Sequence, residues 1–314
     1  MRGANCDRPQ VDICVATYKR PRQLATLLES LLQQDTRGHF TFRIVVIDND
    51  AQGTAEAVVQ RMAVQSVDIV YDVEPQRSIS LARNRGFAHA TGEYIATIDD
   101  DEYADREWLA NLVHALRLYD ADVAFGPTIP LFDAGVPEYI KHCKAFVRPD
   151  PPTGTTENFT DHTGNALVRR AVVGDTPFDP FLGLTGGEDT AFFQRLRRQN
   201  RKLVWCREAR VFSPVPPERA TLLWVAKRAF RNGNGCHRTR LRGPWGPDVS
   251  KGMELLYASK RIATLSCTAS LYLLAGMFNA ERMLPATERL RGLAYMLGLC
   301  AYHFNFHYQA YRRG

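Results

Sequence analysis

The sequence lacks several patterns that would assign a protein to a class at once. Its seven cysteines are scattered, with no CxxC pair or other metal-binding spacing, and an odd number without a framework indicates a reducing compartment. The first ten residues are polar and contain no apolar core of a signal peptide, so we expect a cytoplasmic protein. No phosphate loop of the GxxxxGK type and no recognisable nucleic-acid-binding signature occurs, so nucleic acid is not an expected partner.

What the chain does contain is enough apolar material for a substantial core. With 314 residues, 45% of them hydrophobic and 24% charged, it can form one large α/β domain with an appendage, or two domains. Its net charge is only +6, but much of the excess lies late in the chain. Such a local basic field suits phosphates or an anionic membrane surface. The residues concerned are Lys227, Arg228, Arg231, Arg238, Arg240 and Arg242.

Short apolar runs alternate with helical patterns of ten to fifteen residues through the first two thirds of the chain. This alternation predicts a Rossmann-like α/β fold, in which helices flank a mostly parallel, twisted sheet. The expected strands cover residues 11–16, 43–48, 68–73, 94–98, 122–126 and 202–212, with another strand running out of a polar turn at 161–170. The clearest expected helices cover residues 79–90 and 105–119, and residues 127–152 are expected to be an irregular excursion.

The strand at 94–98 ends in four consecutive acids, Asp99, Asp100, Asp101 and Glu102. In open α/β sheets, ligands bind at the carboxyl ends of strands. Neighbouring carboxylates raise each other's pKa, so their arrangement is costly unless a cation or hydrogen bonds offset it. Asp99 and Asp101 point the same way from an extended chain, and their oxygens suit Mg²⁺ or Mn²⁺. The alternative interpretation is a solvated acidic turn that caps the next helix.

Two other strands also end in polar loops, at Thr17 and Asp48, which gives the sheet one edge shaped for a nucleotide. The helix at 79–90 adds Arg83 and Arg85, either of which could clamp a base or a diphosphate by bidentate contacts. Because they are two residues apart, they cannot share one helix face.

A second acidic site follows paired glycines, in the segment Gly186-Gly187-Glu188-Asp189. Glycines allow the backbone to bend tightly, and the acids then stand at the start of a helix. The alternative interpretation is ordinary capping, because carboxylates at a helix N-terminus are favoured by the helix dipole.

Taken in order, these segments resemble the family-2 glycosyltransferases, inverting enzymes of the GT-A fold that use a nucleotide-sugar donor. The resemblance extends from about Val11 to Ser213. Ala16 and Lys19 replace the usual Pro and Asn of the family's first loop. The segments that carry the resemblance are 17–20, Asp48, Ala82-Arg83-Asn84-Arg85-Gly86, Asp99-Asp100-Asp101, Gly164-Asn165 and Glu188-Asp189.

The resemblance implies a role for each segment. Asp101, with Asp99, would hold Mn²⁺ or Mg²⁺, and Asp189, with Glu188 beside it, would take the proton of the acceptor. Of the two helix arginines it favours Arg83. Ser213 stands roughly where many relatives have a metal-binding histidine, which leaves the ligand set incomplete. The donor, expected to be a UDP-sugar, would be bound by Thr17, Arg20, Asp48, Arg83, Asp99, Asp100, Gly164, Asn165, Arg228 and Arg231.

These positions allow glycosyl transfer by a single displacement. A divalent metal bridging the diphosphate oxygens would stabilise the leaving group. A carboxylate general base typically contributes about 10² to 10⁴ in rate. Two alternatives remain open. One is a nucleotide-sugar-binding protein that has lost catalysis, conceivable because of Lys19 and Ser213. The other is a metal-dependent nucleotidyltransferase, which the missing phosphate loop disfavours.

The character of the chain changes after Ser213, so we expect a catalytic domain at 1–213 and a helical C-terminal region at 214–314. A basic helix is expected at 219–231, ended by Asn232-Gly233-Asn234-Gly235. It resembles a basic segment of exopolysaccharide-type members and is expected to close over the donor phosphates.

Two uncharged or apolar stretches, 262–278 and 293–306, are short of the roughly 20 residues that span a bilayer. They form either packed helices or an interfacial pair that docks on the anionic inner face of the cell membrane. The second interpretation suits a glycan acceptor linked to a polyprenyl lipid.

Overall fold

The structure is a computed structural model that describes residues 8–63, 67–241, 251–276, 282–304, 306 and 308. The chain divides into two compact units. Unit 1 comprises Met1–Ile129, Pro149–Gly183 and Glu188–Ser213, and unit 2 comprises Pro130–Arg148, Leu184–Gly187 and Pro214–Gly314.

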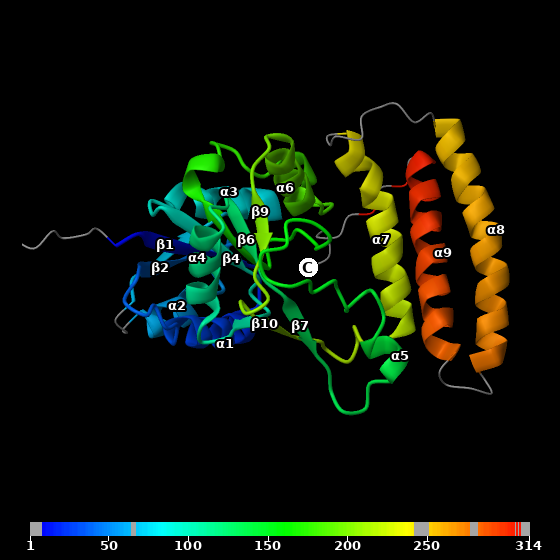
Figure 1. Cartoon of the computed structure of the whole chain (residues 1–314), viewed down its shortest axis with the longest axis horizontal. Coiled ribbons are helices and arrows are strands. Elements are labelled where there is room, and N and C mark those ends of the chain that lie inside the picture. Colours follow the sequence, from blue (N-terminus) through cyan, green and yellow to red (C-terminus); the bar gives the residue numbers. More distant parts are fainter. Residues whose placement is uncertain are drawn as a thin grey trace, which may run out of the picture. The chain divides into compact units, whose positions relative to one another are not determined.

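Unit 1 is built on a seven-stranded sheet. In chain order its strands are β1 (Gln10–Thr17), β2 (Thr41–Asp48), β3 (Ile69–Val73), β4 (Tyr94–Ile98), β6 (Val123–Phe125), β8 (Asn165–Arg169) and β9 (Leu203–Trp205). In space the order is β3-β2-β1-β4-β8-β6-β9, and Figure 1 labels β1, β2, β4, β6 and β9 among them. Only the pairings of β8 with β4 and β6 are antiparallel, which confirms the predicted mostly parallel sheet.

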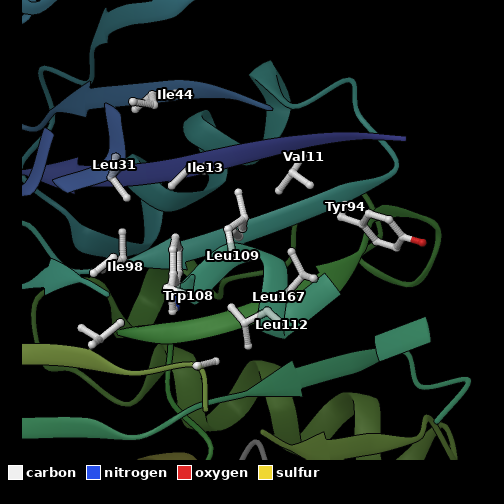
Figure 2. Packing of buried hydrophobic residues seen from close by; sticks show 14 of the residues in the cluster. Val11, Ile13, Leu31, Ile44, Tyr94, Ile98, Trp108, Leu109, Leu112 and Leu167 are labelled. Atoms are coloured by element: carbon white, nitrogen blue, oxygen red, sulfur yellow. The ribbon is translucent and has the colours of Figure 1, made fainter. Parts of the chain in front are cut away.

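Helices cover both faces of this sheet, and side chains alternate between the two faces along each strand. In β1, Ile13 and Val15 pack into one core while Cys14 packs into the other. The first core, with Trp108 near its centre, is drawn in Figure 2. It is covered by α1 (Pro21–Leu32), α2 (Glu56–Met62) and α4 (Trp108–Leu118). The second core is covered by α3 (Ile79–His89) and α6 (Glu188–Arg198).

The predicted strand at 202–212 is wrong, because this segment forms two strands. β9 ends at Trp205, the chain turns where Ala209 N–H donates to the Cys206 carbonyl (3.2 Å), and β10 (Val211–Pro214) follows. β10 pairs with β5 (Tyr103–Ala104) in a second, three-stranded sheet completed by β7 (Thr128–Leu131). The turn is possible because the Ala209 carbonyl is satisfied by a buried side chain, that of Asn165 (2.7 Å). The expected excursion at 127–152 contains β7 and a short helix, α5 (Glu138–Lys141).

Unit 2 contains three long helices, α7 (Leu222–Leu241), α8 (Lys251–Gly276) and α9 (Met283–His303). The predicted helix end at 232–235 is wrong, because α7 continues through it. Gly233 serves packing instead, because a Cβ there would lie 2.0 Å from the Tyr295 carbonyl oxygen. On α9, a Cβ on Gly298 would likewise lie 2.0 Å from the Phe230 carbonyl oxygen. The small residues therefore allow α7 and α9 to approach closely.

The two apolar stretches of the sequence fall largely within α8 and α9, although residues 277, 278 and 305 lie outside the described part of the chain. No helix in the described ranges combines the length and the apolar character needed to cross a bilayer. Four large side chains of α8 are nevertheless more than half exposed: Leu256, Tyr257, Leu271 and Leu274.

Candidate active site

Arg83 on α3 joins the two acidic segments of unit 1. Its guanidinium lies 3.2 Å from Asp99, directly after β4, and forms a second ion pair with Glu188 at the start of α6. Glu188 is only 3% exposed. The backbone before it bends through Gly186 and Gly187, at φ 83° and 95°, a conformation that side chains other than glycine rarely adopt.

The carboxylates around Arg83 act on one another electrostatically. Burial raises the pKa of Asp99, Arg83 opposes this rise, and both Asp101 and Asp189 add to it. Burial likewise raises the pKa of Glu188 to about 7, against the influence of Arg83 and with a further contribution from Asp189. The structure therefore brings together the acid cluster after β4 and the Glu-Asp pair of α6. Their catalytic roles remain predictions.

Two residues of the first loop fix the acid cluster. The Thr17 hydroxyl donates to Asp100 (2.8 Å), and the Arg20 guanidinium lies 2.7 Å from Asp100 and 3.1 Å from Asp101. Burial still outweighs these contacts and raises the pKa of Asp100 to about 6. Thr17 and Arg20, predicted to contact the donor, thus also position the carboxylates that follow β4.

Asp48, predicted to bind the donor, is fully buried at the end of β2. Its carboxylate accepts hydrogen bonds from Ala55 N–H (2.7 Å), Asp50 N–H (3.0 Å) and the Tyr71 hydroxyl (3.2 Å). Asp50, absent from the predicted site, has a buried Oδ2 for which the described residues provide no hydrogen-bond partner. The sequence signal for Asp50 was its position two residues beyond Asp48 in the same loop. Its Oδ2 could accept a hydrogen bond from a bound base.

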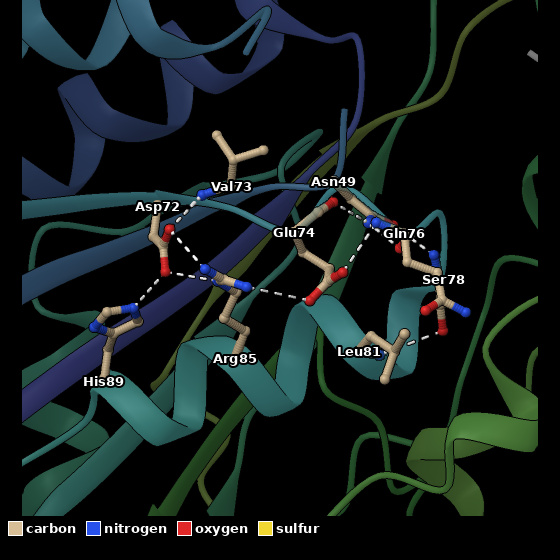
Figure 3. Close-up of polar contacts among 9 residues, drawn as sticks. All are labelled: Asn49, Asp72, Val73, Glu74, Gln76, Ser78, Leu81, Arg85 and His89. Atoms are coloured by element: carbon tan, nitrogen blue, oxygen red, sulfur yellow. Dashed lines mark hydrogen bonds and ion pairs between the residues drawn. The ribbon is translucent and has the colours of Figure 1, made fainter. Parts of the chain in front are cut away.

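The two arginines of α3 face different partners. Arg85 binds Asp72 at the end of β3 (2.6 and 3.1 Å) and lies 3.6 Å from Glu74, while His89 also contacts Asp72 (2.7 Å; Figure 3). This contact with Arg85 is the main cause that holds the pKa of Asp72 below its usual range. Of the two, only Arg83 reaches the acid cluster, as expected for residues two apart on a helix.

Asn84, between these arginines, ties α3 to the segment that leads into α6. It donates to the Phe178 carbonyl (2.8 Å) and accepts from Phe178 N–H (2.9 Å). At the start of α3, Ile79 N–H donates to the carbonyl of Gly183, which lies five residues after Phe178 (3.1 Å). The sequence analysis missed this role of Asn84, although the Ala-Arg-Asn segment contained the signal for it. Arg83 bridges the two acidic segments, and Asn84 holds the backbone of Phe178.

Gly164 and Asn165 occupy different environments. A Cβ on Gly164 would lie 3.1 Å from Asp99 and 3.2 Å from Glu102, so the glycine lets this turn approach the acid cluster. The Asn165 side chain is fully buried, accepts from Trp108 Nε1 (2.8 Å) and donates to two carbonyl oxygens. Asn165 therefore holds the backbone beside the site rather than presenting its amide to a ligand.

No three histidine, cysteine or acidic side chains within the described part converge as a metal site would require. Two carboxylates, Asp99 and Asp101, are nonetheless close enough to repel each other. This pair fits Mg²⁺ or Mn²⁺, which protein sites often hold by one or two carboxylates together with substrate phosphates. The metal would compete with Arg20 for Asp101. Ser213 follows the pair Phe212–Tyr103, so the antiparallel register of β10 with β5 directs it toward Glu102, the last of the four consecutive acids.

Arg228 and Arg231, the remaining predicted donor contacts, lie on α7 in unit 2. Their contact with the donor therefore remains a prediction.

A sheet of this order, with carboxylates at the carboxyl ends of its strands and a Glu-Asp pair at the start of α6, is the arrangement expected of a GT-A glycosyltransferase. Comparison with known proteins identifies the family. Residues 12–176 match the family model described as Glycosyl transferase family 2, and the chain belongs to this family.

Individual relatives agree with this assignment. The chain is 36% identical over 226 residues to the succinoglycan biosynthesis protein ExoM of Rhizobium meliloti, which covers 71% of this chain and 72% of ExoM. It is 25% identical over 271 residues to a glucosyl-dolichyl phosphate glucuronosyltransferase of Haloferax volcanii, covering 81% and 86% of the two chains.

Solved structures confirm the GT-A fold. The mannosyltransferase PcManGT of Pyrobaculum calidifontis, in complex with GDP-Man and Mn²⁺, gives a TM-score of 0.65 at 18% identity, covering 93% of this chain and 87% of that one. S. aureus TarS 1-349, in complex with UDP-GlcNAc, gives 0.54 at 16% identity, covering 96% and 93%.

Proposed function

We propose that this glycosyltransferase transfers a sugar, with inversion, from a nucleoside diphosphate sugar to a hydroxyl of a lipid-linked glycan. The observation that carries the proposal is the position of Arg83 between Asp99 and Glu188, with Asp189 following Glu188 in the chain and acting electrostatically on Asp99. The acids expected to serve the leaving group and the acceptor thus lie within one network in unit 1. A UDP-sugar is the expected donor, and TarS, which binds UDP-GlcNAc, supports this choice.

In this proposal Asp189 accepts the proton of the acceptor hydroxyl as the hydroxyl oxygen attacks the anomeric carbon. Asp189 stands in the first turn of α6, with the buried Glu188 before it. Arg83 holds the segment after β4 and the start of α6 together through its ion pairs with Asp99 and Glu188. A divalent metal, held by Asp99 and Asp101, would stabilise the negative charge of the departing diphosphate.

The names of two relatives support the choice of acceptor. One acts in succinoglycan biosynthesis, and another is named for the transfer of glucuronic acid to a glucosyl-dolichyl phosphate. We therefore propose a role in building a cell-surface or exopolysaccharide glycan on a polyprenyl carrier. The exposed apolar residues of α8 would place the enzyme at the inner face of the membrane by interfacial contact.

The test is a screen of UDP-, GDP- and dTDP-sugars with Mn²⁺ or Mg²⁺, measured by release of the nucleoside diphosphate. With the active donor, Asp189→Asn should lower kcat by about 10² to 10⁴ while the affinity for the donor is kept. Asp175→Asn, a change at an exposed acid, is the matched control and should match the wild type.

Two results would overturn the proposal. If the wild-type protein bound a donor but gave no turnover under all of these conditions, it would be a binding protein. Cleavage between the phosphates would also overturn it: release of a sugar phosphate would identify transfer of the nucleotidyl group, and release of a nucleoside monophosphate would identify transfer of the sugar phosphate.

A further inference from the structure

Unit 2 contains a group of arginines that we call the arginine cluster: Arg148, Arg219, Arg228 and Arg231. At its centre lies Arg228, on α7. Burial, and then the like charges of Arg148, Arg231 and Arg219, lower the pKa of Arg228 to about 10. Arg228 thus keeps its positive charge at neutral pH in surroundings that disfavour it.

Aromatic side chains hold Arg228 in a defined orientation. Its guanidinium lies over the Trp224 ring, 5.1 Å from the centroid, and Trp224 stacks on Phe146 at 5.3 Å with an interplanar angle of 14°. Trp224, Arg228 and Arg231 follow at i, i+4 and i+7, so they share one face of α7. Arg148 enters from the segment that carries Phe146. A guanidinium that lies over an aromatic ring can still donate from its N–H groups to an acceptor.

Three members of the cluster, Arg148, Arg228 and Arg231, differ from the arginines of unit 1 in their neighbours. Across the described ranges, no ion pair includes Arg148, Arg228 or Arg231, whereas Arg20, Arg83 and Arg85 each contact an acid. The Nη1 group of Arg148 is buried, and no acceptor among the residues described bonds to it. A buried donor without an acceptor, beside several like charges, is costly and would be satisfied by an external anion.

The chemistry of the cluster favours a phosphate or diphosphate group. Guanidinium groups bind phosphate oxygens by paired hydrogen bonds, and several arginines match an anion with more than one charge. The cluster is also adjacent in sequence to exposed apolar side chains: Leu223, next to Trp224, is 64% exposed, and Val147, next to Arg148, is 47% exposed. A phosphate attached to a hydrocarbon chain satisfies both features.

We propose that the arginine cluster binds the phosphate or diphosphate group that links the acceptor glycan to its lipid carrier. This inference rests on the proposed function, because it assigns the acceptor of that reaction a site of its own. It replaces the expectation that Arg228 and Arg231 contact the donor. The donor diphosphate has the same chemistry, so the experiment must separate the two sources.

The experiment measures binding to the full-length chain by isothermal titration calorimetry, with farnesyl diphosphate, farnesol and UDP as probes. Farnesyl diphosphate should bind the wild type, and farnesol should bind at least tenfold more weakly. Arg231→Gln and Arg148→Gln should each weaken farnesyl diphosphate at least tenfold and leave UDP within twofold of the wild type. Lys227→Gln, which removes an exposed charge from the same helix, is the matched control and should change neither.

Each other outcome overturns the inference. If Arg231→Gln weakened UDP as much as farnesyl diphosphate, the cluster would belong to the donor site. If Lys227→Gln weakened farnesyl diphosphate as much as Arg231→Gln does, the attraction would be diffuse and no specific site would exist. Absence of farnesyl diphosphate binding would remove the site. Circular dichroism melting confirms that each variant is folded, and should one variant not fold, the other still decides.

Binding is measured without turnover, so the two proposals can fail separately. Loss of the lipid diphosphate site would leave donor cleavage by the wild type intact, and absence of donor cleavage would leave the binding result intact. With turnover in hand, Arg231→Gln should raise KM for a lipid diphosphate acceptor and leave KM for the donor unchanged.

Discussion

Arg83 in unit 1 and Arg228 in unit 2 are both largely buried cations, but their neighbours carry opposite charges. Arg83 lies between carboxylates, Asp99 and Glu188, and is satisfied within its own unit. Arg228 lies among other arginines and is oriented by an aromatic ring. The first arrangement is typical of a preorganised network whose ion pairs hold the site in shape. The second is typical of a site completed by a ligand. The sign of the surrounding charge, rather than burial itself, distinguishes the two.

The largest expected effect is that of Arg83→Met. It leaves Glu188 buried without its cation, and removing one partner of a buried pair typically costs about 3 to 5 kcal/mol. We expect a loss of this size in the free energy of unfolding at pH 8, measured by urea denaturation. Arg85→Met, the same change two residues along α3, removes a partly exposed ion pair and should cost no more than about 1 kcal/mol. Equal losses in the two variants would contradict the network described for Arg83.

The next effect concerns α7, the helix that carries Arg228 and Arg231. Gly298→Ala would force a Cβ to within 2.0 Å of the Phe230 carbonyl oxygen, and overpacking of this kind costs about 1 to 3 kcal/mol. Gly235→Ala, in the same helix as Phe230, meets nothing within 4 Å and should stabilise the protein by up to about 1 kcal/mol. Thermal melting followed by circular dichroism measures both changes. Destabilisation by both would argue against the close contact of α7 and α9.

A smaller effect sharpens the comparison through pH. Because the folded protein raises the pKa of Glu188 from 4.5 to about 7, it retains a proton that the unfolded chain releases. The contribution of Glu188 to stability is therefore present below about pH 4.5 and declines as the pH rises to about 7. Glu188→Gln removes this dependence. The melting temperature of the variant minus that of the wild type should therefore increase from pH 5 to pH 8. A difference that is constant across this range would show that Glu188 does not titrate as described.

The smallest effect is that of Arg228→Met. This change removes a charge that its neighbours oppose and keeps an apolar side chain against Trp224, so stability should stay within about 1 kcal/mol of the wild type at low ionic strength. The contrast with Arg83→Met, measured by the same denaturation, is the direct test of the comparison. A loss as large as that of Arg83→Met would indicate a partner for Arg228 within the protein.

The sequence predicted the frame of the site well because local patterns determine it. The strands that end at Thr17, Asp48 and Ile98 are apolar runs that stop at polar residues, and parallel pairing brings their ends to one edge. The spacing of Arg83 and Arg85 sufficed to separate their directions. The GT-A fold, the family and the mostly parallel sheet are confirmed.

What the sequence could not reveal depends on contacts between distant residues. Asn232-Gly233-Asn234-Gly235 has the composition of a helix end, and only the close approach of Tyr295 shows why the helix continues. The bend between β9 and β10 depends on Asn165, some forty residues earlier. The roles of Asp50 and Asn84 also required three-dimensional information, because one is defined by a buried oxygen and the other by the backbone of Phe178.

Lys19 has a consequence for protein engineering. Its φ of 53° lies in the left-handed region, which asparagine and glycine adopt more readily than lysine does. Asparagine is also the residue that this loop usually carries in the family the chain resembles. The turn thus carries a side chain that suits its backbone less well, with the Tyr18 ring 5.3 Å from the ammonium group. Replacing Lys19 with asparagine is accordingly a simple route to a more stable enzyme, and it tests what the charge of Lys19 contributes.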